Sequence, residues 1–255
     1  MKFWVFSISR KTGLKKILVK YPAPVGILIF GSIWGLLQGT IGAAFGSLDF
    51  FFKSQLHVCP CPIVGAILGI PIMTAALAIY KRPAMLIGIG LAAIPFSFLA
   101  IPIQHIPAFT TATTTYPIIN PIVAMIFSSV IFSTVATLVM RKSELTTPVL
   151  VGAGALSGFL SSIAFIYTVV ALGAPILKAT GIGSQFAYIA TNGVVWAAIS
   201  AATSPVGYMT APKIQLKISP LISQNRWFYR LAPVALIVTC WVVSAIFAAA
   251  GLRAL

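Results

Sequence analysis

Long apolar stretches, separated by short segments that carry Lys and Arg, dominate this sequence. A bilayer core of about 30 Å requires about 20 consecutive apolar residues in a helix. The stretches that meet this requirement cover residues 24–46, 61–80, 83–103, 118–140, 148–172, 187–209 and 230–250. The sequence therefore predicts an all-α fold, a polytopic transmembrane helix bundle of about seven spans. We expect a single integral membrane domain, with the bundle over residues 24–250.

The charge content excludes several classes of protein. Only 7% of the residues are charged, whereas a soluble domain carries about 25%. The two acids, Asp49 and Glu144, are predicted on opposite sides of the bilayer, so they cannot form the carboxylate pair of a hydrolase. The net charge of +15 comes from basic residues next to spans, a pattern that marks cytoplasmic ends and favours anionic lipid. We therefore expect a lipid bilayer as surroundings, no nucleic-acid partner and no enzymatic activity.

The basic residues also predict an orientation. Fourteen of the 17 Lys and Arg fall in one set of alternating segments and three in the other, which places the N-terminus in the cytoplasm. Residues 1–20 then form a basic cytoplasmic or interfacial segment, either a short overhang or a helix on the inner leaflet. If residues 187–209, which include Asn192 and Pro205, form a re-entrant element, six spans remain and the C-terminus moves inside.

Glycines recur at a spacing of four residues in three of the predicted spans. They are Gly31, Gly35 and Gly39 in the first, Gly65 and Gly69 in the second, and Gly154 and Gly158 in the fifth. Such faces let two helix backbones approach closely. One interpretation is packing inside this bundle. The other is docking onto a partner membrane subunit, for which the long glycine face of the first span is best suited.

Cysteine and histidine gather at the start of the second span. His57, Cys59 and Cys61 lie within five residues, and His105 lies in a loop predicted on the same outer side. Two thiolates and two imidazoles suit zinc, and fewer ligands suit Cu(I), so Zn or Cu at Cys59 and Cys61 is one interpretation. A redox-active thiol pair in the oxidising compartment is a second. The third is that the cysteines only begin a helix, with proline in its first turn.

A few polar or amphipathic residues lie inside or near the predicted spans and are candidates for binding a substrate. They are Asp49, Gln38, Asn192 and Trp196. Asp49 follows the first span beside three phenylalanines, where it meets a ligand, pairs with Lys53 or Lys178, or caps a helix. Polar side chains in a membrane usually face the bundle interior, where they either join helices or line a pocket.

The layout of residues 24–172 resembles a known family. It combines a glycine-rich first span, the turn Tyr80-Lys81-Arg82-Pro83-Ala84, the basic turn Met140-Arg141-Lys142 and a helix start from Pro148 to Gly158. This pattern is similar to the substrate-binding S component of energy-coupling-factor transporters, of the thiamine and hydroxymethylpyrimidine type. The resemblance implies about six helices that bind a vitamin or metal from outside, with a membrane coupling subunit and two ATPases as partners. The family's ligand residues often include acids within spans, which this chain lacks, so no ligand residue is transferred.

Two functions follow as hypotheses. The first is a multi-pass transport protein of the cell membrane that binds a small solute, a vitamin precursor or a metal-like one, from the outer face. Because the chain has no ATP-binding motif, a partner or a gradient must supply the energy. The alternative is a membrane subunit of a redox or metal-handling complex that uses Cys59, Cys61 and the histidines.

Overall fold

The structure, a computed structural model, describes residues 21–46, 59–103, 119–142, 145–174, 176–224 and 226–252, and all regular structure in these ranges is helical. The first five helices are α1 (Ala23–Gly46), α3 (Pro60–Tyr80), α4 (Met85–Ile103), α5 (Ile119–Lys142) and α6 (Thr147–Ala171). The short elements α7 (Ile176–Thr180), α8 (Gln185–Tyr188) and the π-helix η1 (Ile189–Gly193) follow. The last two helices are α9 (Val194–Gln224) and α10 (Arg226–Leu252).

Six helices among the described residues are long and apolar enough to cross a membrane. They are α1, α3, α5, α6, the continuous stretch Gln185–Lys217 and α10. This confirms a helical membrane-type bundle. The stretch that the six-span alternative treated as re-entrant is one of these six, with 33 residues. Helix α4, with 19 residues, is the shortest of the long helices.

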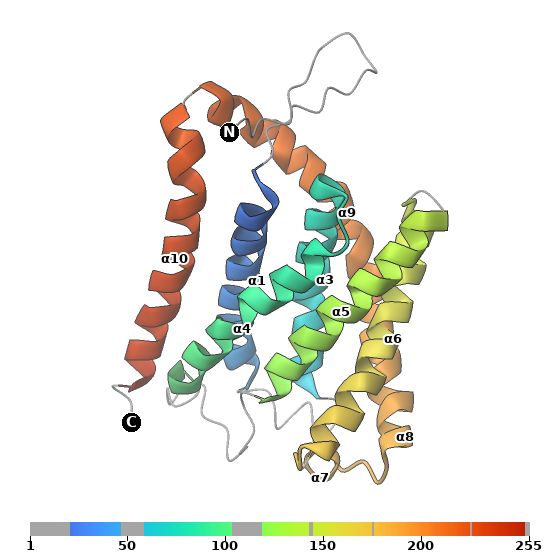
Figure 1. Cartoon of the computed structure of the whole chain (residues 1–255). Helices are drawn as coiled ribbons and strands as arrows, with labels where there is room; N and C mark the ends of the chain where they lie inside the picture. Colours follow the sequence, from blue (N-terminus) through green and yellow to red (C-terminus); the bar gives the residue numbers. More distant parts are fainter. Residues whose placement is uncertain are drawn as a thin grey trace.

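Helix α3 lies at the centre of the packing (Figure 1). It packs against α9, α1 and α5, while α1 also packs on α4 and α6 packs on α9 and α5. Helix α10 lies at one edge and contacts mainly α4 and α1 (Figure 1). Its exposed face carries large apolar side chains such as Val234, Val242 and Phe247. Such a face suits lipid, which is as apolar as these side chains.

Glycines allow the closest contacts between helices. A Cβ at Gly31 would lie 2.5 Å from the Cβ of Ala92, and a Cβ at Gly35 would overlap the ring of Phe96, both on α4. On α9, a Cβ at Gly207 would overlap the carbonyl oxygen of Pro71 on α3. Packing inside the bundle therefore explains Gly31 and Gly35, and α4 occupies the face that was considered for docking a partner.

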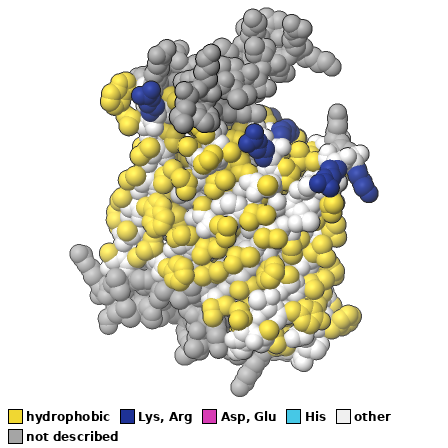
Figure 2. Space-filling view, viewed as in Figure 1, with side chains coloured by type: hydrophobic (Ala, Val, Ile, Leu, Met, Phe, Trp, Pro, Cys, Tyr) yellow, Lys and Arg dark blue, Asp and Glu magenta, His cyan; other side chains and the backbone are white. Residues whose placement is uncertain are grey.

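The described Lys and Arg side chains mark one end of the bundle, which we call the basic end. They are Lys81, Arg82, Arg141, Lys142, Lys213, Lys217 and Arg230. On the face drawn in Figure 2, all dark blue side chains lie along the upper edge. The opposite end contains the last residues of α1, the start of α3 and α8 (Figure 1).

Aromatic rings accompany the charges at the basic end. The Lys81 ammonium donates a hydrogen bond to the Tyr208 hydroxyl and lies 4.4 Å from the centre of that ring. Tyr21 stacks on Tyr229 with ring centres 4.8 Å apart, and burial, followed by the neighbouring Tyr229, raises the pKa of Tyr21. Basic and tyrosine side chains together are typical of a membrane–water interface.

Candidate functional site

A buried hydrogen bond joins the start of α3 to the π-helix. The backbone N–H of Cys59 donates to Oδ1 of Asn192 at 2.8 Å, and both residues are buried. Cys59 immediately precedes α3, where backbone N–H groups lack partners within the helix. The Asn192 amide supplies one such partner from η1.

Local side-chain bonds support the turn that presents Asn192. The Ser184 hydroxyl accepts from the Ala187 N–H at 3.1 Å and so caps α8. The Thr191 hydroxyl donates to the Ala187 carbonyl at 3.0 Å and accepts from Nδ2 of Asn192 at 3.1 Å. A π-helix turn is rare and is often found at functional sites.

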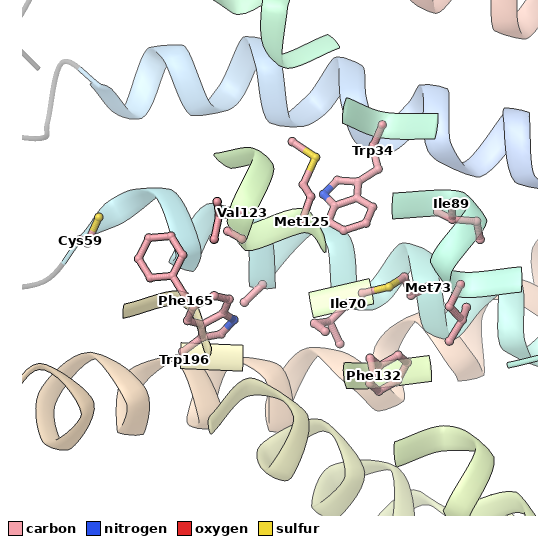
Figure 3. Close-up of a cluster of buried hydrophobic side chains, with 14 of the residues drawn as sticks. Trp34, Cys59, Ile70, Met73, Ile89, Val123, Met125, Phe132, Phe165 and Trp196 are labelled. Carbon is pink, nitrogen blue, oxygen red and sulfur yellow. The ribbon is translucent and has the colours of Figure 1, made fainter. Parts of the chain in front are cut away.

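Three aromatic rings pack beside this turn. The ring of Phe165 on α6 lies 6.4 Å from that of Tyr188 and 5.9 Å from that of Trp196, measured between centres. Figure 3 shows Phe165 directly beside Trp196. A Cβ at Gly158 would lie 2.7 Å from the carbonyl oxygen of Trp196, so α6 and α9 touch along their backbones here.

Trp34 and Gln38 form a second group, one turn apart on α1. Both side chains are buried and lie over α3. The indole ring of Trp34 fills the space above Gly69, where a Cβ would overlap it. Above Gly65, the nearest atom to a Cβ would be Oε1 of Gln38, at 3.8 Å. Figure 3 shows Trp34 beside Met125 of α5.

Several buried side-chain atoms in the described part of the chain have no hydrogen-bond partner. They include Trp34 Nε1, Gln38 Oε1, Ser97 Oγ, Asn120 Oδ1, Ser162 Oγ, Trp196 Nε1 and Ser200 Oγ. Other buried hydroxyls are satisfied: Ser133 donates to the Pro83 carbonyl at 2.9 Å, and Ser204 to the Leu150 carbonyl at 2.7 Å. An unsatisfied buried group costs about 1–3 kcal/mol, so a cluster of them needs an explanation.

Most of these atoms lie in the half of the bundle away from the basic end, which we call the distal half. At 1.5 Å per residue, Gln38 is about 12 Å from the last residue of α1, and Ser162 is about 14 Å from the last residue of α6. By the same rise, Trp196 is about 17 Å from Gln185, the first residue of α8. Asn120 is in the first turn of α5 at that end. The distal half therefore contains uncharged donors and acceptors inside an apolar bundle.

Three of the four predicted substrate-binding residues lie inside this half. Gln38 is 6%, Asn192 4% and Trp196 1% exposed. Gln38 lies above Gly65 of α3 and Asn192 bonds to Cys59 at the start of α3, so both residues border the same helix. Asp49 lies outside the described residues. The substrate-binding role of all four stays a prediction.

The predicted metal ligands are described only in part. Cys59 is 2% exposed, whereas His57, His105 and the side chain of Cys61 lie outside the described residues. Within the ranges that the structure describes, no three residues among His, Cys, Asp and Glu come together to hold a metal. Zinc or copper at this position, and the redox alternative, therefore stay predictions.

Sequence reasoning missed Trp34 and the π-helix. The signal for Trp34 was its spacing of four residues from Gln38, which places both on one face of a helix. The signal for η1 was weaker, because Thr191-Asn192-Gly193 interrupts an apolar run without fixing the geometry of the turn.

Comparison with protein-family models, with curated proteins and with solved structures finds no match for this chain.

Proposed function

We propose that this chain is a multi-pass protein of the cell membrane that binds a small uncharged solute from the outer face, as the membrane component of a transport system and not as an enzyme. One observation carries the proposal. Buried donors and acceptors without partners, among them Gln38 Oε1 and Trp196 Nε1, gather in the distal half. A solute that hydrogen-bonds to them would remove the cost of leaving them unsatisfied.

The chemistry of the cluster favours an uncharged solute. Its members are indole, amide and hydroxyl groups, and the described Lys and Arg side chains lie at the basic end. A charged solute buried beside such groups would find no counter-charge among the described side chains of this half and would be costly to desolvate. A vitamin-precursor-like molecule therefore agrees better with this cluster than a metal ion.

Orientation follows in the proposal from the positive-inside rule. With seven spans and a cytoplasmic N-terminus, the basic end faces the cytoplasm and the distal half opens to the outside. Energy would come from a gradient or from a membrane coupling subunit with ATPases, as the family resemblance implies. Since α4 covers Gly31 and Gly35, such a subunit would contact other surfaces of the bundle.

Native mass spectrometry of the protein in lipid nanodiscs tests the proposal. We expect the wild-type protein to carry a bound small molecule. Trp196→Phe, which removes only the indole N–H and part of the ring, should carry less of it. Trp227→Phe is the matched control, because Trp227 is 73% exposed on α10. Protein without any bound molecule, together with cells that show no saturable uptake dependent on this chain, would contradict the proposal.

A further inference from the structure

We infer that Trp34 and Gln38 form a subsite beside Gly65 for a flat, uncharged group that carries an N–H next to a carbonyl, as in an amide or lactam. The inference rests on the proposed function and names the part of the solute that this subsite would recognise. Within the ranges that the structure describes, Trp34 Nε1 and Gln38 Oε1 both lack a hydrogen-bond partner.

The two atoms have opposite hydrogen-bonding roles. The indole Nε1–H can only donate, and the amide Oε1 can only accept. Residues four apart on a helix lie on one face with Cβ atoms about 5–6 Å apart. A ligand that satisfies both must therefore present an acceptor and a donor a short distance apart, which describes the two sides of an amide.

The surface of α3 that faces Trp34 and Gln38 leaves space for an added atom at Gly65. A Cβ at Gly69 would overlap Trp34, but a Cβ at Gly65 would meet only Gln38 Oε1, at 3.8 Å. Among the described atoms, a Cβ added at Gly65 would thus make only an ordinary van der Waals contact. A glycine there leaves bare backbone, against which a flat group can lie closely.

The distance of the described cations from Gln38 favours a neutral group in the subsite. Gln38 is about 23 Å along α1 from Ala23, the first residue of that helix on the basic side. The described cations are therefore remote from Gln38, and a carboxylate bound there would have none of them as a partner. An amide forms two neutral hydrogen bonds and leaves no charge buried.

Two fragments of nearly equal shape test the subsite, each titrated into nanodiscs with empty nanodiscs as the blank. Benzamide carries both the carbonyl and the N–H, whereas acetophenone has a methyl group in place of the NH₂. We expect the wild-type protein to bind benzamide more tightly. Gln38→Leu should lower the affinity for benzamide about fivefold, the effect of one neutral hydrogen bond, and leave the affinity for acetophenone unchanged. Trp34→Phe should lower the affinity for both fragments. Gln215→Leu, near the basic end, should lower neither affinity.

Steric blocking at Gly65 gives a second, independent readout. Gly65→Leu should abolish benzamide binding, whereas Gly152→Leu should not, because nothing lies within 4 Å of a Cβ at Gly152. Equal affinity for the two fragments, or benzamide binding that survives both Gln38→Leu and Gly65→Leu, would overturn the subsite. If the co-purified molecule is lost in Trp196→Phe but kept in Gln38→Leu, only the subsite fails. If neither the wild type nor any variant carries a bound molecule, and cells show no saturable uptake dependent on this chain, the proposed function fails with it.

Discussion

At the scale of single residues, two kinds of buried polar side chain bear on the candidate site. Those of Asn192, Ser133 and Ser204 bond to the backbone of another segment. Those of Gln38 and Trp196 include an atom without a partner. The sequence alone could not separate helix-joining from ligand-facing polar residues, because both kinds look alike inside an apolar run.

Replacing Asn192 should lower stability. Asn192→Leu removes the Oδ1 acceptor of the buried Cys59 N–H, so we expect the free energy of unfolding to fall by about 1–3 kcal/mol. Unfolding in mixed micelles with increasing SDS measures this change. The control is Thr134→Ala, which removes an exposed hydroxyl that bonds only within α5. Equal stability of Asn192→Leu and wild type would show that the hydrogen bond contributes nothing.

At the scale of helices, hydrophobic length predicted most of the fold. The predicted span 24–46 corresponds to Ala23–Gly46, and the predicted span 148–172 to Thr147–Ala171. The largest error concerns α9, which continues to Gln224 although the prediction ended at residue 209. The hydropathy of the sequence falls near Lys213 and Lys217, so a prediction from apolar length ends there. A helix that leaves the bilayer can nevertheless continue in water, where no membrane limits its length.

The contact between α3 and α9 depends on the glycine at position 207. We expect Gly207→Ala to lower the free energy of unfolding by about 1–3 kcal/mol, because its Cβ would overlap the Pro71 carbonyl. Gly152→Ala should be neutral or stabilising by up to about 1 kcal/mol, because its Cβ meets nothing within 4 Å. Thermal unfolding in detergent, compared between the two variants, tests this difference. Equal effects would mean that α9 can move away from α3 without cost.

The candidate site was only partly predictable at this scale. Gln38, Asn192 and Trp196 stand out as polar or amphipathic residues in apolar runs, which is a signal in the sequence itself. That Asn192 bonds to Cys59, across 133 positions of chain, depends on how α3 and η1 pack together. No local pattern determines such a long-range pairing.

At the scale of the whole molecule, charge is separated along the bundle. The described basic side chains share one end, and the uncharged polar cluster lies in the distal half. A bilayer keeps such ends on different sides, since positively charged segments are retained in the cytoplasm. The arrangement gives the molecule a direction, which the proposed uptake from outside requires.

Sided labelling tests that direction. In a background with the native cysteines replaced, Gly183→Cys near the start of α8 should react with an impermeant maleimide on intact cells. Arg141→Cys at the basic end should react only after the cells are made permeable. The reverse pattern would place the basic end outside and contradict the orientation.

The central claim is that the distal half contains a site that opens to the outside beside Gly65. In the same cysteine-free background, we predict that Gly65→Cys reacts with a small impermeant methanethiosulfonate on intact cells. Ala66, the next residue of α3, is buried like Gly65 but is not part of the proposed subsite, so Ala66→Cys should stay unreactive at the same depth. If both positions are inert, or if Gly65→Cys reacts only after the cells are opened, the distal half contains no outward-facing site and the account is wrong.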